Sequence, residues 1–386
     1  MRIGIHTEHV RDTGRRFCEG ISEFARERPD WELVFFEEGI GRARDLEGLD
    51  GFIWAIPDAK TARRLVATGK PVVDTASKGK YPGTVGVAGD HVNCGKAAAR
   101  HFLTRGFVNF GYFGWEGLGF SDDRGRAFAA ALKSEGFECL GYRPGARISG
   151  SYLIRDVEQE RFVVPKEADS VVAWVRQLPK PVAVFCANDY RAWQLSEICR
   201  LAEVSVPGEV AILGAGNDEL ACLFTGTRIS SVDTGAKELG VLTAKTLDDI
   251  LSGRRRADDF ALVEMEPRGV VERESTAVYP IDPPWLAEAM TYIHENVSAR
   301  LTADDVCRKV CKSYGTVAEA FRTKLGTTIQ KVIAASRLHV AEQLLKTSHL
   351  SLTEISRLSG FKTPQYFCAC FRDKHGCSPT DFVSSL

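Results

Sequence analysis

The sequence predicts an α/β part with two lobes and parallel sheets, followed by an all-α part with two helix-turn-helix units. In the first part, short β-branched and aromatic runs alternate with helical stretches, which is typical of parallel sheets covered on both faces. The segment YPIDPP at 279–284 then holds three prolines in six residues, and these block both a helix and a central strand. Beyond it, glycine becomes sparse and apolar residues recur at helical spacing. We therefore expect boundaries at 1–278, 279–284 and 285–386.

The α/β part is too large for one sheet. About 280 residues exceed what one compact sheet of this kind usually holds, so we expect two lobes. In such a fold a ligand lies outside the carboxyl ends of the strands, in the crevice between the lobes. Helices are expected at 14–28 and 91–105. The predicted strands are RIGIH (2–6), WELVFF (31–36), GFIWAI (51–56), PVVDTA (71–76), TVGVAG (84–89), NFGYFGW (109–115), PVAVFCA (181–187), VAILGAG (210–216) and ISSVD (229–233).

The all-α part contains an internal repeat. Residues 301–306 and 350–355 share one pattern of apolar, hydroxyl and acidic residues, and each copy leads to a helix with Phe, basic residues and Gly. Two short helices joined by a tight turn, repeated once, predict tandem helix-turn-helix units. The expected helices are WLAEAMTYIHENV (285–297), LTADDVCRKVCKS (301–313), TVAEAFRTKLG (316–326), TIQKVIAASRLHVAEQLLKTS (328–348), SLTEISRLSGF (351–361) and TPQYFCACFRDKHG (363–376).

The second unit carries clear local signals. Ser351 can cap a helix, with Glu354 at the capping-box position. Gly360 suits the sharp turn because that turn needs a positive φ. Thr363 then caps the next helix, and Pro364 takes its first position, where a missing N–H costs nothing.

The helix after this turn has one buried and one exposed face. Its two phenylalanines, Phe367 and Phe371, are four residues apart and are expected in the core. The opposite side presents Lys362, Thr363, Gln365, Tyr366 and Ala369 near the helix N-terminus, the end that a recognition helix offers to DNA bases. Gln can bond bidentately to adenine, and Tyr and Lys can hold phosphates. The alternative is a plain helical bundle with solvated polar faces.

This stretch resembles the DNA-binding domain of the AraC family of transcription regulators, over roughly 284–382 and most closely over 350–382. The resemblance implies that each unit sends one helix into the major groove, the two grooves lying one turn apart on one face of the DNA. In the first unit we expect contacts from Ser313, Tyr314 and Thr316. That unit departs from the family, because Cys311 occupies the usual glycine of the turn, and Tyr314 and Glu319 stand where Arg is common.

The α/β part resembles the sensor core of LacI/GalR regulators, which shares its fold with periplasmic sugar-binding proteins. The residues that carry this resemblance lie at 85–114, 121–137, 183–193, 206–219 and 228–253. LacI-type chains place their DNA-binding helices first, whereas here the chain starts in the first strand and the AraC-type domain follows. That order resembles the family of xylose operon regulators. It implies a double-stranded DNA operator, a small sugar effector such as D-xylose, a homodimer and, for an activator, contact with RNA polymerase.

Polar side chains at or near the carboxyl ends of predicted strands are candidates for the sugar. Arg124 occupies the S-x-x-R position of the resemblance and could donate to two hydroxyls; the alternative is a surface Arg paired with Asp122 or Asp123. Asn188 and Asp189 follow one strand directly. We expect Asp189 to accept from a hydroxyl pair, to cap the next helix, or both.

Further candidates follow the next strand, start the first predicted helix or carry aromatic rings. Asn217 and Asp218 come after VAILGAG, beside Gly216, where the family usually has Asp. Arg15 aligns with an Arg of the xylose regulators. Trp115 is a candidate for stacking on the sugar ring; Phe120, Trp54 and Trp193 are others, each equally expected in the core.

Composition excludes several classes. No apolar run reaches 18 residues and the N-terminus lacks a signal-peptide core, so we expect a cytoplasmic protein with no membrane partner. The 11 cysteines are scattered without zinc-ligand spacing, so no metal or cofactor is expected. From Asp282 onward 13 Lys and Arg face 10 Asp and Glu, a charge of +3, and the overall −1 leaves −4 for the rest. This modest offset fits a nucleic-acid-binding tail.

Other classes of protein are alternatives to a sugar-controlled regulator. A transport-type sugar-binding protein would carry a signal peptide and no helix-turn-helix tail. An enzyme is disfavoured because G-x-S-x-G, P-loop and H-E-x-x-H motifs are absent. A cytoplasmic sugar-binding or sugar-modifying protein without a DNA role stays the main alternative, and a structural oligomer is the last.

Overall fold

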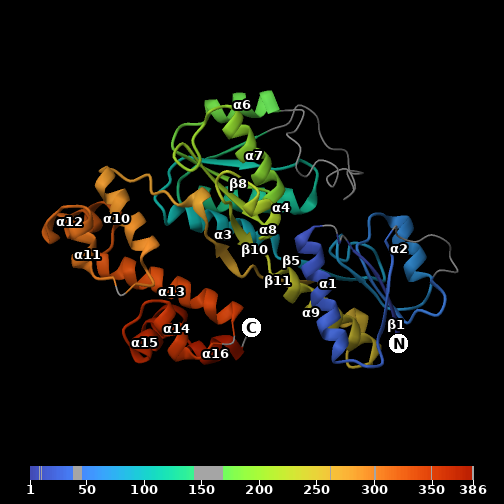
Figure 1. Ribbon diagram of the computed structural model, residues 1–386. Coiled ribbons are helices and arrows are strands. Elements are labelled where there is room, and N and C mark those ends of the chain that lie inside the picture. The colour runs from blue at the N-terminus through green and yellow to red at the C-terminus, as the bar shows by residue number, and fades with distance from the viewer. Residues whose placement is uncertain are drawn as a thin grey trace. The chain divides into compact units, whose positions relative to one another are not determined.

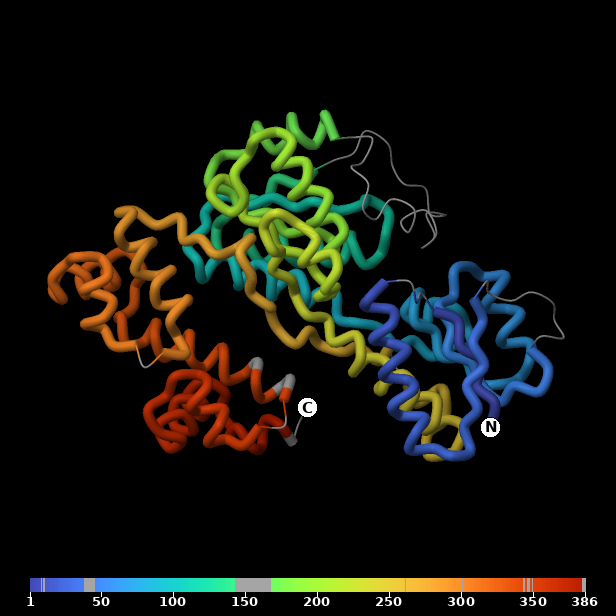
Figure 2. The backbone as a smooth tube through the Cα atoms, in the orientation of Figure 1, coloured from blue at the N-terminus to red at the C-terminus, as the bar shows by residue number. Residues whose placement is uncertain are grey.

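The computed structural model describes residues 1–7, 9, 11–37, 46–142, 168–260, 262–299, 301–348 and 350–384. The chain forms two compact units. The first consists of Met1–Arg100 and Asn109–Thr276, and the second of His101–Val108 and Ala277–Leu386. Figures 1 and 2 show α/β structure in the first and helices in the second.

The first lobe of the α/β unit is built on a parallel six-stranded sheet in the order β11-β5-β4-β3-β1-β2. Its inner strands are buried on both faces, which is why their sequences read as continuous apolar runs. The strands are β1 (Arg2–His6), β2 (Glu32–Phe35), β3 (Gly51–Trp54), β4 (Val72–Asp74), β5 (Val85–Gly89) and β11 (Val263–Met265), and the helices are α1 (Asp12–Arg26), α2 (Ala59–Val66) and α9 (Ala236–Leu251), with a short turn η2 (Ala257–Asp259).

Helices α1 and α9 lie side by side against this sheet (Figure 1). Two glycines allow the close approach, because a Cβ on Gly20 would overlap the carbonyl oxygen of Lys237, and one on Gly240 would overlap that of Phe17. The core beneath them contains Ile3, Ile5, Phe17, Ile21, Ile53, Val73 and Val87. A segment from late in the chain thus completes a lobe that begins at the N-terminus.

The second lobe has a six-stranded sheet in the order β12-β10-β9-β8-β6-β7, parallel except for the edge strand β12. The strands are β6 (Phe110–Phe113), β7 (Cys139–Gly141), β8 (Val182–Cys186), β9 (Val210–Ala215), β10 (Ser230–Asp233) and β12 (Gly269–Val271). The helices are α3 (His91–Leu103), α4 (Gly119–Ser134), α6 (Ala168–Gln177), α7 (Asp189–Leu201), α8 (Glu219–Leu223) and the short η3 (Glu274–Thr276). The chain crosses between the lobes after β5, after β10 and after β11.

The helical unit has two small cores joined by α13. Its helices are α10 (Pro284–Glu295), α11 (Ala303–Lys309), α12 (Tyr314–Leu325), α13 (Ile329–Thr347), α14 (Leu352–Leu358), α15 (Pro364–His375) and α16 (Pro379–Ser384). The first half of α13 packs Ile329 and Ile333 into a core with α10, α11 and α12. Its second half packs Leu338, Ala341 and Leu345 into a core with α14 and α15 (Figure 1).

The predicted fold class is confirmed: two parallel-sheet lobes precede a helical part with two helix-turn-helix units. The predicted strand at 31–36 is shorter, Glu32–Phe35, and lies mostly exposed at the sheet edge. The predicted helix at 14–28 begins earlier, at Asp12, and ends at Arg26. The three-residue strands β7, β11 and β12 were not predicted, because so short a run carries no readable periodicity.

Candidate effector site and nucleic-acid interface

Asp218 connects the two lobes at the carboxyl ends of their strands. It caps α8 by accepting from the Ala221 N–H at 3.1 Å. Its second oxygen accepts from the Tyr190 hydroxyl at 2.8 Å and from the Asp12 N–H at 3.1 Å. Because Asp12 belongs to the first lobe, this buried carboxylate joins one lobe to the other.

Asp189 is buried beside it, with 1% of its surface exposed. One oxygen accepts from the Asp218 N–H at 2.7 Å and the other from the Ser231 hydroxyl at 2.5 Å. Burial is the main reason that the pKa of Asp189 rises to about 6, since an ionised carboxyl is costly away from water. A Cβ on Gly214 would overlap Asp189 Oδ1, and one on Gly216 would lie 3.2 Å from Oδ2. The glycine that replaces the family's usual Asp at 216 therefore leaves room for this carboxylate.

The neighbouring asparagines hold backbone and side-chain partners. Asn188 caps α7, accepting from the Arg191 N–H at 2.9 Å, so the capping role considered for Asp189 falls to Asn188. Asn217 has a left-handed backbone, with φ of 55°. Its side chain accepts from Arg273 Nη2 at 2.8 Å. The structure thus brings Asn188, Asp189, Asn217 and Asp218 to one edge, where each already has a hydrogen-bond partner.

Arg124 has unused donor capacity. Its side chain projects from α4 and is 7% exposed. Nη1 donates to the Ala187 carbonyl at 2.6 Å, and the guanidinium carbon lies 5.4 Å from the Phe120 ring. In the described part of the chain, the Nε–H has no acceptor. The ion pairs considered with Asp122 and Asp123 are not formed; Asp123 pairs with Arg126 and Lys78 instead.

Two residues that sequence reasoning missed lie near Arg124. His91, at the start of α3, has its ring centroid 6.2 Å from that of Phe120. Burial, with the nearby charges of Arg124 and Lys78, lowers the pKa of His91 to about 3, so the imidazole is neutral. Lys78 Nζ lies 3.2 Å from Asp123 Oδ2 and 3.1 Å from Glu264 Oε1, a second link between the lobes. Lys78 lies outside the segments that carry the resemblance, whereas His91 lies within the segment 85–114, although sequence reasoning gave it no role.

Arg191 was also missed, although it lies within the segment 183–193 that carries the resemblance. It is 2% exposed, and its guanidinium carbon lies 3.9 Å from the Phe113 ring and 4.9 Å from the Trp115 ring. Nη1 donates to Gln194 Oε1 at 2.9 Å. The guanidinium thus lies at cation–π distance from Trp115, the ring that we expect to stack on a sugar.

The remaining candidates divide between the site and the core. Trp115 is half-buried and lies edge-on to Phe120, with ring centroids 6.2 Å apart. Trp54 is fully buried. Trp193 packs against the second lobe's core and donates to the Phe224 carbonyl at 2.8 Å. Arg15 is exposed, with Nη2 3.7 Å from Asp12 Oδ1.

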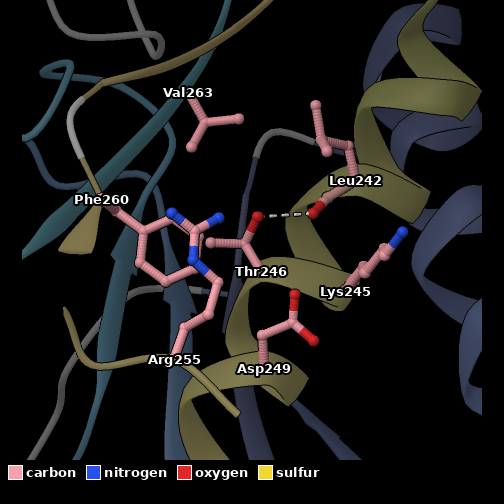
Figure 3. A pocket seen from close by; sticks show the side chains of 7 residues that line it. All are labelled: Leu242, Lys245, Thr246, Asp249, Arg255, Phe260 and Val263. Carbon is pink, nitrogen blue, oxygen red and sulfur yellow. Dashed lines mark hydrogen bonds between the residues drawn. The ribbon is translucent and has the colours of Figure 1, made fainter.

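A pocket of about 220 Å³ opens elsewhere in the first lobe, between α9 and the segment leading into β11 (Figure 3). Seven residues line it: Leu242, Lys245, Thr246, Asp249, Arg255, Phe260 and Val263. Phe260 precedes β11 and Val263 is its first residue, so the pocket lies toward the amino ends of the parallel strands, the edge opposite the predicted sugar site. None of the predicted site residues lines it.

The second helix-turn-helix unit has the local geometry that its sequence predicts. Ser351 and Glu354 form a reciprocal capping box. Gly360 turns the chain with φ of 82°. Thr363 Oγ1 accepts from the Tyr366 N–H at 3.2 Å, with Pro364 as the first helical residue. Behind this helix, Phe367 and Phe371 are fully buried.

Both recognition helices present exposed side chains at their N-termini. In the second unit, Lys362, Thr363, Gln365, Tyr366 and Ala369 are all exposed. In the first, Ser313 caps α12 by accepting from the Thr316 N–H at 3.2 Å. Tyr314 is 48% exposed and its hydroxyl accepts from Gln330 Nε2 at 2.9 Å. These surfaces are available to DNA without any change in the fold of each unit.

The turn of the first unit adopts the conformation that normally requires glycine. Cys311 has φ of 51° and an exposed side chain. Its place in the turn corresponds to that of Gly360 in the second unit. The first unit therefore keeps the backbone shape of a helix-turn-helix at the cost of a strained residue.

Comparison with known protein families identifies both parts of the chain. A periplasmic binding protein-like domain matches residues 99–276, and a helix-turn-helix domain matches 306–385. Within the described residues, no helix is both long and apolar enough to span a bilayer. The predicted combination of a periplasmic-binding-protein-like domain with a helix-turn-helix domain is confirmed.

The chain is similar along nearly its whole length to xylose operon regulatory proteins. It is 25% identical to the xylose operon regulatory protein of Haemophilus influenzae, covering 95% of this chain and 94% of that protein. The corresponding protein of Escherichia coli K12 is 26% identical, covering 95% and 93%. The resemblance to xylose operon regulators is thus confirmed.

Solved structures show the same fold. That of a xylose-binding transcription activator matches with a TM-score of 0.59 and 24% identity, covering 100% of this chain and 98% of that one. A LacI family regulator from Enterococcus faecium with bound ribose matches with a TM-score of 0.57 and 19% identity, covering 72% and 98%. The second match covers the share of this chain that an α/β part alone would account for.

Proposed function

We propose that this protein is a transcription regulator that binds a double-stranded operator through its tandem helix-turn-helix units and responds to a small sugar, such as D-xylose, held between its two lobes. The single observation that carries the DNA role is the pair of capped recognition helices with exposed polar N-termini. In this proposal residues 1–278 sense the sugar, 279–284 link the parts and 285–386 bind DNA. The full-length similarity to xylose operon regulatory proteins supports it.

The sugar role rests chiefly on Arg124. A buried guanidinium with an unused N–H is unfavourable unless something accepts from it, and a sugar hydroxyl offers such an acceptor. Trp115 and Phe120 supply apolar faces nearby for the C–H surface of the ring. A solved relative of the fold binds ribose and another binds D-xylulofuranose, which supports a small sugar as the ligand class.

Control follows from linkage. A sugar shifts the protein only if it binds one arrangement of the lobes better than another. The Asp12–Asp218 and Lys78–Asp123 contacts exist only when the carboxyl ends of the two sheets face each other at short range. We infer that the sugar adds to these contacts and that the protein acts as a homodimeric activator that contacts RNA polymerase, working in the cytoplasm and without enzymatic activity of its own.

The test is a thermal-shift screen of the full chain against pentoses and hexoses, D-xylose first. A ligand at 100 times its Kd stabilises by about 2.7 kcal/mol. Arg124→Met should lose the shift, whereas Arg126→Met, which alters an exposed arginine on the same helix, should keep it. Equal shifts in both variants would remove Arg124 from the site. A sugar-binding protein that enriches no duplex from a random library would favour the alternative without a DNA role.

A further inference from the structure

Arg337 lies midway along α13, between the two helix-turn-helix units. Although it is an arginine, only 8% of it is exposed. Its Nη2 donates to the carbonyl oxygen of Leu301 at 2.8 Å. Leu301 directly precedes Thr302, the residue that caps α11. The guanidinium is therefore hydrogen-bonded to the backbone where the first helix-turn-helix unit begins.

The same guanidinium lies against the turn of the second unit. A Cβ built on Gly360 would come within 3.1 Å of Arg337 Nε and would overlap the carbonyl oxygen of Val297. Val297 lies just beyond α10, which packs in the core of the first helix-turn-helix unit. The turn between α14 and α15 thus rests on Arg337 and on backbone that belongs to the first unit.

The burial of Arg337 is not explained by a gain in the stability of the fold. Within the described residues it forms no ion pair, and its Nε–H lacks an acceptor. Burial lowers the pKa of the guanidinium, and the neighbouring Tyr366 opposes that shift. A buried charge without a carboxylate destabilises a fold relative to an apolar side chain of similar size. Its hydrogen bond to Leu301 and its packing against Gly360 instead reach both helix-turn-helix units.

We propose that Arg337 is a positioning residue that holds the recognition helices α12 and α15 at one separation and thereby sets the spacing between the two major-groove sites that the protein accepts. This inference rests on the proposed DNA-binding function. Two linked reading units gain affinity over one only when the linkage lets both reach their sites together. A fixed connection also avoids the entropic cost of ordering the units upon binding. Rigidity then translates into a strict spacing, about one helical turn of DNA between sites on one face.

The experiment uses full-length protein and a duplex that it enriches from a random library. Affinity is measured for that duplex, for versions with one or two base pairs inserted between the two contacted boxes, and for a version with one box scrambled. The affinity of the wild type should fall about tenfold or more when one base pair is inserted, because the second helix-turn-helix unit no longer reaches its box. Arg337→Met keeps the length of the side chain and removes its donors. In this variant the insertion should lower the affinity only about threefold or less. The variant should bind the duplex with one scrambled box as tightly as the wild type does.

Controls separate positioning from folding. Arg357→Met removes an exposed arginine from α14. We call the affinity for the enriched duplex divided by the affinity for the duplex with one inserted base pair the spacing ratio. Arg357→Met should leave this ratio unchanged, even if it weakens binding to all the duplexes alike. If Arg337→Met does not fold by circular dichroism, Arg337→Lys, which retains one donor toward Leu301, should give an intermediate ratio. A wild-type spacing ratio in the folded Arg337 variant would overturn the inference, as would a wild type that tolerates insertions. A wild type that enriches no DNA at all would overturn the proposed function and this inference with it.

Discussion

Gly360→Ala should destabilise the helical unit by far more than the same change at another left-handed glycine. Gly360 has φ of 82°, where an alanine costs about 1–2 kcal/mol. The added methyl would also overlap the Val297 carbonyl oxygen, and overpacking of this kind costs about 1–3 kcal/mol. Against these, alanine restricts the unfolded chain and returns about 0.4–1 kcal/mol. Together these effects should lower the free energy of unfolding by about 2–4 kcal/mol.

Gly376→Ala is the matched control. Gly376 follows α15 with φ of 72°, and a Cβ there would meet nothing within 4 Å. Only the backbone cost remains, about 0.5–1 kcal/mol after the unfolded-state gain. Urea denaturation followed by far-ultraviolet circular dichroism, with equal m-values, measures both. Equal losses at 360 and 376 would refute the reasoning, because the close approach to Val297 would then carry no energetic weight.

Three further predictions concern single side chains. Cys311→Gly should stabilise the helical unit by about 0.5–1 kcal/mol, since it relieves a left-handed residue with φ of 51°; lower stability in urea would contradict this. Gln365→Ala should weaken binding to the enriched duplex by about 1–3 kcal/mol, and unchanged affinity would exclude a bidentate base contact. Asp189 has a pKa raised to about 6, so its protonated form is the one that the fold favours. The stability it contributes is full below its unfolded pKa and is lost as pH rises through about 6. The free energy of unfolding should therefore fall, relative to Asp189→Asn, by up to about 3 kcal/mol between pH 4 and 7; a constant difference across that range would contradict the cause assigned to the shift.

Local signals explain which parts could be predicted from sequence. The caps at Ser351 and Thr363 and the turn at Gly360 depend on residues within a few positions of one another, so they are legible in the sequence. The link between Asp12 and Asp218 joins residues 206 positions apart, and no periodicity encodes it. The same is true of Lys78 and His91, whose surroundings arise only after the strands align.

The residue type indicates which side chains tend to be buried, but it does not show which of two similar side chains is buried. Trp54 and Trp115 both lie at or just after strand ends, yet Trp54 is fully buried and Trp115 is half-buried beside Phe120. Which of them faces a ligand depends on the neighbouring strand and helix rather than on the residue itself. Likewise, the sequence shows that Gly216 stands where the family usually has Asp, but it does not show that Asp189 lies against this position.

The three crossings between the lobes also determine the order in which the protein can be completed on the ribosome. The first lobe begins at residue 2 but lacks α9 and β11 until residue 265 has been made. Until then the edge of β5 and the face of α1 that surrounds Gly20 have no partner, and unpaired strand edges of this kind invite association between nascent chains. The helical unit, whose helices pack mainly on near neighbours in sequence, can fold soon after it emerges. The N-terminal lobe is thus finished late, and we expect premature stops before residue 265 to yield aggregates rather than a free sugar-binding fragment.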